Sequence, residues 1–108
     1  MNKLTDVDKY PTFMIKNNRL IKVSLLDIEG TTFSDPHQWH HFVRKTIRKN
    51  NPEFYARVEH LQKMILMPSE MNYDLEGMSE NGFANKWGGL NKDDLVFNRS
   101  KWREGYYE

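Results

Sequence analysis

The spacing of apolar residues changes along the chain, from a strand pattern near the start to a helical period in the middle. Over residues 12–18 apolar side chains alternate with polar ones, which is typical of a half-buried strand. Residues 19–28 are apolar and β-branched and indicate a second strand. Between them stands Asn17-Asn18, and asparagine tolerates the left-handed backbone of a tight turn. The pattern predicts a β-hairpin.

A helical period follows. Residues 42–49 place their apolar side chains on one face of a helix and most of their cations away from it. Asn51 is expected to cap a second helix, with Pro52 at its first position. The apolar residues of that helix recur at i, i+4 and i+7 and end at Leu61. Strand and helix patterns in one chain predict an α+β fold.

The next segment is apolar and short. Residues 63–67 fit either a buried strand or the end of the preceding helix, and the run ends at Pro68. Ser69 is expected to cap a further helix through Glu76, which Gly77 stops.

The remaining residues are broken by Asn-Gly and Gly-Gly pairs and are expected to be rich in loops. Their aromatic content is too high for a disordered tail, so we expect them to fold back on the core. The segment from Asn98 to Arg103 sets cations between aromatic residues, as nucleic-acid contacts do. It fits equally well a buried Trp102 with its neighbouring cations reaching solvent.

Composition limits the class of protein. A chain of 108 residues is expected to form one domain. The absence of cysteine excludes disulfides, thiolate zinc sites and a cysteine nucleophile. No apolar run approaches the roughly 20 residues of a membrane span, and the first residues show no signal-peptide core. We therefore expect a protein that acts in the cytoplasm and has no membrane partner.

The charge is unevenly spread although its total is only +1. Residues 35–66 hold six basic and three acidic residues, a balance of +3. Residues 67–108 hold five basic and eight acidic residues, a balance of −3. The basic middle could face an anionic ligand, or it could be a solvated helix face.

Three of the four histidines fall within five residues, in the segment that precedes the first helix. His37 is interpreted as an exposed loop residue. His40 and His41 are adjacent, and adjacent side chains diverge on a strand and on a helix alike. One of them can bind a metal while the other faces a substrate only in a special local geometry. Downstream, Asn72 and Glu76 are four residues apart and share one helix face.

The segment Trp39-His40-His41, followed by a strand candidate and a helix, resembles the HNH/endonuclease VII-like nucleases. It resembles in particular their short toxin domains, which carry a Trp-His-His or Leu-His-His motif. The resemblance covers roughly residues 35–77 and implies a ββα-metal core. The expected fold is thus a small single α+β domain, residues 1–108, with an N-terminal β-hairpin and a ββα-metal-like core that holds an inserted helical segment.

The resemblance also implies residue roles. His41 would be the catalytic base, and His40, Asn72 and Glu76 would hold a divalent metal. Gln62 would tie the loop before the second strand, in place of the family's usual asparagine. Two helix histidines of the family are replaced here by Asn72 and Glu76. Oxygen ligands favour Mg²⁺, while Mn²⁺, Zn²⁺ and Ni²⁺ stay open as alternatives.

The chemistry implied is hydrolysis of phosphodiester bonds by a metal-dependent endonuclease, with DNA favoured as substrate. His41 would take a proton from water, and Arg44, Lys45 or Arg48 would hold backbone phosphates. The toxin resemblance implies delivery into the cytoplasm of a target cell and a cognate immunity or inhibitor protein as partner.

Two other functions compete with the nuclease. The chain could be a phage-encoded or accessory protein that binds and inhibits a host protein through its acidic, aromatic last third. It could also be a non-catalytic nucleic-acid-binding module that uses the cations of residues 44–49.

Overall fold

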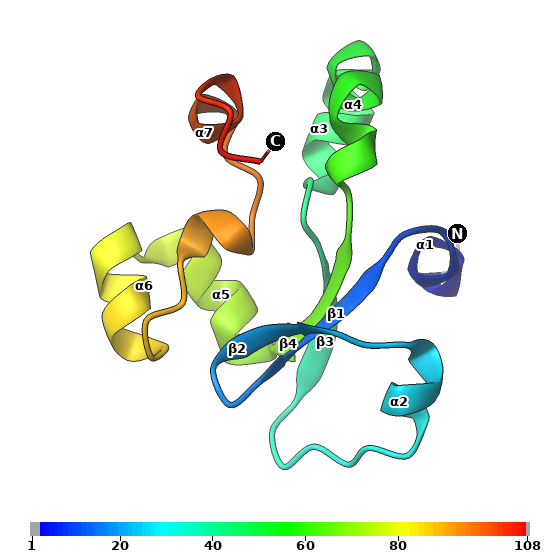
Figure 1. Cartoon of the computed structure of the whole chain (residues 1–108), viewed down its shortest axis with the longest axis vertical. Helices are drawn as coiled ribbons and strands as arrows, with labels where there is room; N and C mark the ends of the chain where they lie inside the picture. Colours follow the sequence, from blue (N-terminus) through cyan, green and yellow to red (C-terminus); the bar gives the residue numbers. More distant parts are fainter. Residues whose placement is uncertain (1–2, 108) are drawn as a thin grey trace.

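Four strands form one mixed sheet. The computed structural model describes the backbone of residues 3–107 and the side chains of residues 6–107. In chain order the elements are α1 (Lys3–Lys9), β1 (Thr12–Lys16), β2 (Arg19–Lys22), α2 (Leu25–Glu29), β3 (His37–His41), α3 (Lys45–Asn50), α4 (Pro52–Val58), the 3-10 helix η1 (Glu59–Leu61), β4 (Met64–Pro68), α5 (Ser69–Gly77), α6 (Glu80–Lys86), the 3-10 helix η2 (Lys92–Asp94) and α7 (Arg99–Arg103). Figure 1 shows α5 and α6 on one side of the strands, α1 and α2 on the other, and α3, α4 and α7 beyond one end.

The hairpin predicted from the sequence is confirmed. β1 and β2 pair antiparallel, and Lys16 lies opposite Arg19 across the turn. Asn17 and Asn18 both adopt positive φ angles, 53° and 58°, as a two-residue hairpin turn requires. The second strand is shorter than predicted, because it ends at Lys22.

A helix replaces the end of the predicted second strand. The side chain of Ser24 accepts a hydrogen bond from the backbone N–H of Asp27, and Asp27 accepts one from the backbone of Ser24. This reciprocal capping box satisfies backbone N–H groups at the start of a helix, and α2 begins at the next residue. The apolar residues of this segment favour a strand, but the capping box at Ser24 stabilises a helix instead.

β3, β4 and α5 follow the strand–strand–helix order expected from the sequence, with α3, α4 and η1 inserted between the two strands. β4 is the ambiguous apolar run, and it is a strand. It pairs antiparallel with β3 and parallel with β1, so the sheet order is β2-β1-β4-β3. The helix α5 leaves directly from the end of β4.

Two helix boundaries differ from the prediction. α3 begins at Lys45 and not at residue 42, because the backbone before it is bonded elsewhere: Phe42 N donates to Lys63 O, and Phe42 O accepts from Phe97 N. Ser69 is the first residue of α5 and not its cap, a position held by Pro68 without a side-chain hydrogen bond.

The last third contains more helix than expected. Several of its polar residues, in a segment predicted to be rich in loops, cap helices instead. Ser79 caps α6, Asn91 caps η2 and Asn98 caps α7. Each side chain accepts a hydrogen bond from the first turn of its helix. The segment does fold back on the core, as its aromatic content predicted.

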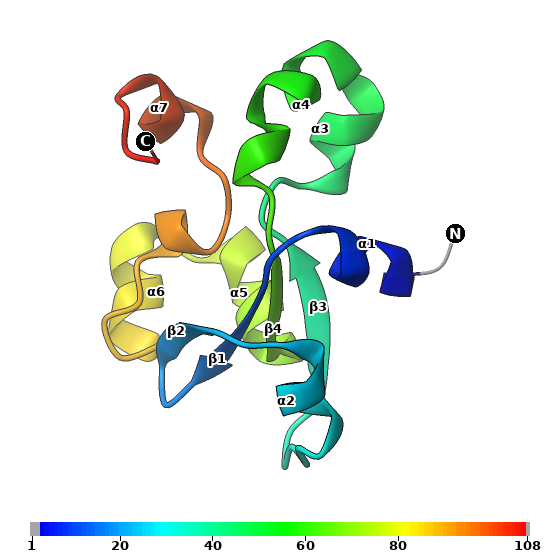
Figure 2. The ribbon, with the colours of Figure 1, turned by 45° about the vertical axis from the view of Figure 1, so that its right-hand side comes forward.

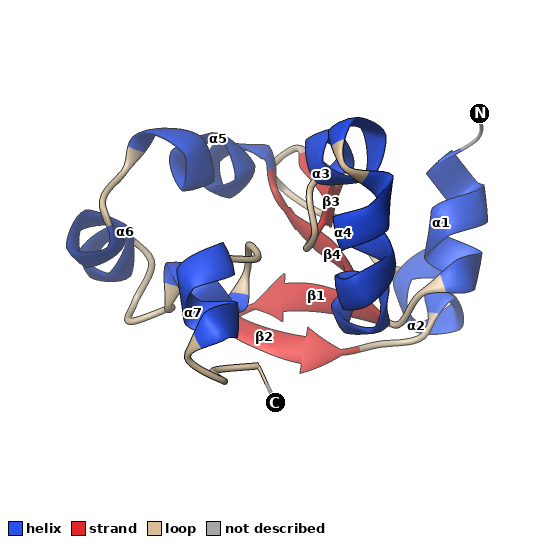
Figure 3. Cartoon of the chain, turned by 90° about the horizontal axis from the view of Figure 1, so that it is seen from above, coloured by secondary structure: helices blue, strands red, loops and turns tan. Residues whose placement is uncertain are grey.

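The core has two parts. The larger lies between the sheet and α5 and α6, and its buried residues are Ile15, Ile65, Met67, Met71, Leu75, Phe83, Leu95 and Val96. The second lies beyond the end of β3 and β4, where α4 meets α7 (Figure 3), and its buried residues are Phe42, Val43, Phe54, Tyr55, Val58 and Phe97. The strand ends between these two parts carry the histidine pair.

Among the residues that the structure describes, none of the helices has the length and apolar character needed to cross a membrane.

Candidate functional site

A cleft of about 410 Å³ lies where β3, the N-terminus of α3 and α5 meet. Six of the residues selected from the sequence line it: His40, His41, Arg44, Lys45, Asn72 and Glu76. The strand places the histidines, the loop before α3 places the cations, and α5 contributes Asn72 and Glu76. Residues separated by more than thirty positions therefore share one surface depression.

His40 is held neutral. Its side chain is 9% exposed, and burial lowers its pKa to about 4. Nε2 lies 3.0 Å from the backbone oxygen of Leu95. A carbonyl oxygen only accepts, so Nε2 carries the hydrogen and Nδ1 keeps its lone pair. This is the arrangement in which a histidine that binds a metal is fixed by a backbone carbonyl.

His41 is oriented by a carboxylate. Its Nε2 lies 2.8 Å from Oδ2 of Asp6, and the two side chains are only 11% and 8% exposed. Because an ionised carboxylate accepts, Nε2–H donates, and Nδ1 is the ring nitrogen that does not bind Asp6. The hydrogen bond from His41 is the main cause that lowers the pKa of Asp6, and the charge of Arg48 lowers it further.

Asp6 is the functional candidate that sequence reasoning missed. It lies on α1, which runs beside β3 (Figure 2), 35 residues before its partner. Val7 anchors the helix in the core, and the hydroxyl of Tyr10 donates to Glu59 over 2.6 Å. No local motif marks Asp6, because only the packing of α1 brings it to His41.

The three candidate phosphate ligands have different surroundings. Arg44 Nη1 lies 2.7 and 3.0 Å from the two carboxylate oxygens of Glu76, so the two charges form a pair within the cleft. Lys45 is exposed at the rim. Arg48 lies outside the cleft, with its Nη2 3.5 Å from Oδ2 of Asp6. Arg48 thus contacts the carboxylate that binds His41, whereas the sequence predicts that it holds a phosphate.

Gln62 binds the backbone of the loop after β3. Its Oε1 accepts from Val43 N over 2.8 Å, and its Nε2 donates to Val43 O over 2.9 Å. The side chain is 3% exposed, and its amide also donates to the hydroxyl of Tyr55. This amide gives the loop the two hydrogen bonds that a neighbouring strand would otherwise supply.

His37 differs from its interpretation as an exposed loop residue. It is the first residue of β3, it is half-buried, and its ring stacks on Phe33 with 3.9 Å between centroids. Its Nδ1 lies 2.9 Å from the backbone oxygen of Asp35. It does not line the cleft of His40 and His41.

The cleft offers few donors to a metal ion. His40 and Asn72 offer a nitrogen and an amide oxygen to the same cleft, while Glu76 is already paired with Arg44. Among the described residues no group of three or more His, Asp or Glu side chains is placed to hold a metal. The set suits Mg²⁺, which binds few protein ligands and completes its shell with water and substrate phosphate.

Comparison of the chain with protein-family models, with curated proteins and with solved structures returns no match. The assignment of a function therefore depends on the geometry of the cleft.

We call the two hydrogen bonds between the Gln62 amide and the backbone of Val43 the Gln62 clamp. Removal of the amide is expected to lower the free energy of unfolding strongly. In Gln62→Met the shape is retained, but two buried backbone groups of Val43 lose their partners, at about 1–3 kcal/mol for each. We expect urea denaturation to show a loss of roughly 3 kcal/mol. Gln38→Met, on an exposed position of β3, is the control and should stay within about 0.5 kcal/mol of the parent. Equal effects of the two substitutions would contradict the clamp.

The neutral state of His40 predicts a pH dependence. In the unfolded chain its pKa returns to the ordinary value of 6.5, so between pH 6.5 and about 4 the unfolded state binds more protons. The free energy of unfolding should therefore fall as the pH is lowered through this window. In His40→Gln that decline should be much smaller, and the acid loss due to Asp6 should remain at lower pH. Denaturation curves at pH 7, 5.5 and 4.5 measure the decline due to His40, and curves below pH 3.8 measure the loss due to Asp6.

Proposed function

We propose that the protein is an endonuclease that hydrolyses phosphodiester bonds, with DNA as the favoured substrate. One observation carries the proposal: a histidine backed by a carboxylate lies in the same cleft as a neutral histidine, two cations and an amide. General-base catalysis needs a base that is oriented and desolvated on one side. Phosphate binding beside it needs cations. The cleft brings both together.

In the proposed reaction, Nδ1 of His41 takes a proton from a water molecule. The oxygen of that water attacks phosphorus, the bond from phosphorus to the leaving sugar oxygen breaks, and the proton is returned through solvent to that oxygen. Asp6 keeps the ring of His41 in the tautomer that exposes Nδ1 and stabilises its charge after protonation. Arg44 and Lys45 bind the non-bridging oxygens of the substrate.

A divalent ion, Mg²⁺ in the first place, belongs to this proposal. His40, through Nδ1, and Asn72 would hold it, and it would neutralise charge that develops on the phosphate and the leaving oxygen. Glu76 is available to it only when Arg44 turns to the substrate, because both of its oxygens are bound to Arg44. The family resemblance of residues 35–77 adds a toxin effector role and a cognate immunity protein to the proposal.

Inhibition of a host protein has less support. That function needs aromatic residues of the last third on the surface. Tyr73 and Tyr106 are exposed there. The larger aromatic cluster is not available, because Trp102 and Tyr107 pack against the second core and Trp87 against the first. The indole of Trp87 also donates to Asp74.

The activity test uses plasmid DNA with Mg²⁺ or Mn²⁺. We expect the parent protein to nick it and His41→Ala to lose at least about a hundredfold in rate, the usual contribution of a general base. Asp6→Asn should be intermediate, because the base remains but its orientation is lost. His37→Ala is the matched control and should retain activity. Cleavage that persists in His41→Ala, or is absent with every divalent ion, would overturn the proposal.

Glu76→Gln separates two roles of this carboxylate. As the partner of Arg44, its neutralisation frees the guanidinium for phosphate, so we expect KM to fall by up to about fivefold with kcat retained, as for one ion pair of about 1 kcal/mol. Steady-state rates on a short duplex at several Mg²⁺ concentrations measure this. A collapse of kcat together with a higher Mg²⁺ requirement would instead identify Glu76 as the metal ligand expected from the sequence.

A further inference from the structure

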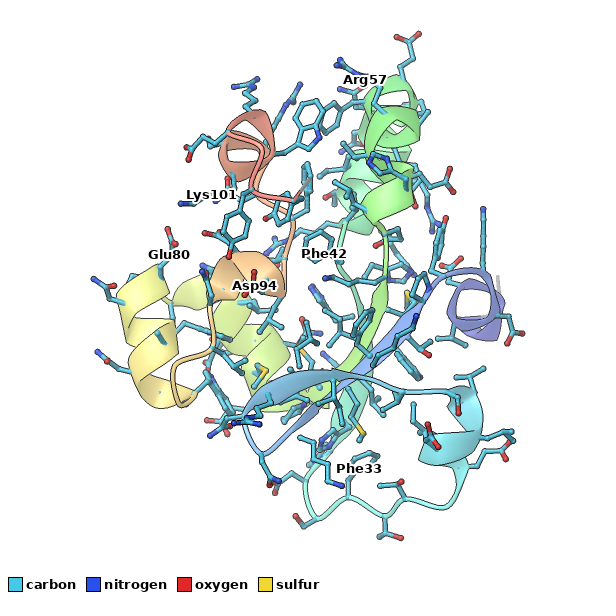
Figure 4. All side chains as sticks on the ribbon, viewed as in Figure 1. Phe33, Phe42, Arg57, Glu80, Asp94 and Lys101 are labelled. Carbon is cyan, nitrogen blue, oxygen red and sulfur yellow. The ribbon has the colours of Figure 1, made fainter. Side chains whose placement is uncertain are left out.

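Two stretches that are far apart in sequence pack together beyond the sheet. Residues 42–58 form the loop after β3 with α3 and α4, and residues 97–107 contain α7. Phe54 contacts Trp102 edge-on with 5.3 Å between ring centroids, and Phe42 contacts Tyr107 at 5.4 Å. We call these two stretches the helical lobe; Figure 4 shows Phe42 at its base, with Arg57 and Lys101 in its upper part.

The helical lobe is strongly basic. It holds eight basic residues and two acidic ones, whereas the other residues of the chain hold eight basic and thirteen acidic. The basic residues are Arg44, Lys45, Arg48, Lys49, Arg57, Arg99, Lys101 and Arg103. The cations of α7 belong to an acidic third of the sequence, but in the folded chain they lie near the cations of α3. The balance within the lobe is +6, and it is +4 when Glu76 and Asp6, the partners of Arg44 and Arg48, are counted with it. Such an excess in a nearly neutral protein is an electrostatic footprint for a polyanion.

The cations continue from the histidine cleft. Arg44 lines the cleft and also a second depression. Arg99 and Lys92 line this depression together with the acidic residues Glu80 and Asp93. Arg99 in turn lines a third depression with Thr46, and Thr46 is again a residue of the cleft. The three depressions therefore adjoin one another around the N-terminus of α3, and they lead from His41 to α7.

The aromatic residues of the lobe are covered by cations of the same chain. Arg99 lies over the ring of Phe54 at 4.1 Å, Arg57 over Trp102 at 5.4 Å, and Lys101 over Tyr106 at 5.8 Å. Bases of a nucleic acid would have to displace these cations in order to stack. The guanidinium and ammonium groups themselves remain able to bind phosphate oxygens.

From this arrangement we infer that the helical lobe is a binding surface for the phosphate backbone of a polynucleotide, without sequence preference. It delivers the strand to the cleft, so the inference extends the proposed function to the path of the substrate. Of the exposed large apolar side chains among the described residues, Leu26, Tyr73 and Tyr106, only Tyr106 belongs to the helical lobe, and its hydroxyl donates to Asp94. An anionic membrane, which would favour exposed apolar residues beside the cations, is the less suitable occupant.

The experiment measures binding apart from cleavage. All variants carry His41→Ala, and fluorescein-labelled 20-nucleotide DNA, single-stranded and duplex, is titrated by anisotropy at several salt concentrations. Lys49→Glu with Arg99→Glu removes two cations of the lobe. Arg19→Glu with Lys22→Glu removes two exposed cations of β2 and changes the net charge equally. Thermal unfolding checks that both proteins are folded.

We expect the lobe variant to bind at least about tenfold more weakly and to lose about two from the slope of log K against log salt, one for each phosphate contact. The control should match the His41→Ala parent, and oligonucleotides of different sequence should bind alike. Equal losses in both double variants, no binding at low salt, or binding only to vesicles of anionic lipid would overturn the inference.

The two proposals can fail separately. If the lobe binds DNA as expected but the parent protein cleaves no DNA, the binding surface is supported and the catalytic role of His41 is contradicted. If the parent cleaves DNA and the lobe variant binds DNA as tightly as the control does, the nuclease proposal is supported and the lobe is not the path of its substrate.

Discussion

The bond between the Gln62 amide and the backbone of Val43 is the interaction on which the arrangement depends. At this point β3 has ended and α3 has not begun, so the backbone groups of Val43 have no partner in a strand or a helix. A buried backbone group without a partner is costly. The amide of Gln62 satisfies both groups and fixes the direction in which the chain leaves the sheet. The positions of His41 before the clamp and Arg44 after it follow from this geometry.

The sequence predicts well the parts of the fold that are set locally. The turn at Asn17-Asn18, the cap at Asn51 and the strand–strand–helix order all arise from residues close to one another. The end of β2 was mispredicted because the capping box of Ser24 outweighs the apolar pattern that favours a strand. The amides and hydroxyls of the last third were ambiguous for a similar reason, since the same side chains end loops and begin helices.

The candidate site, too, contains residues that a local sequence pattern predicts and residues that only tertiary packing brings to it. The adjacent histidines and the two polar residues of α5 were found from spacing, and the structure brings them to one cleft. Asp6 could not be found, because its role exists only when α1 packs beside β3. The pairing of Arg44 with Glu76 and the turn of Arg48 toward Asp6 are equally long-range. Counting charge along the chain also fails to reveal the basic helical lobe, because the basic residues of the lobe belong to two sequence regions of opposite net charge.

The insertion between β3 and β4 leaves the sheet and returns to it at almost the same point, where Phe42 N donates to Lys63 O. The register of the two strands is therefore independent of how many residues the insertion contains. Closing a longer loop costs little, about 0.6 kcal/mol for each doubling of its length. The helices of the insertion and the strands that hold the histidines can thus change at different rates during evolution.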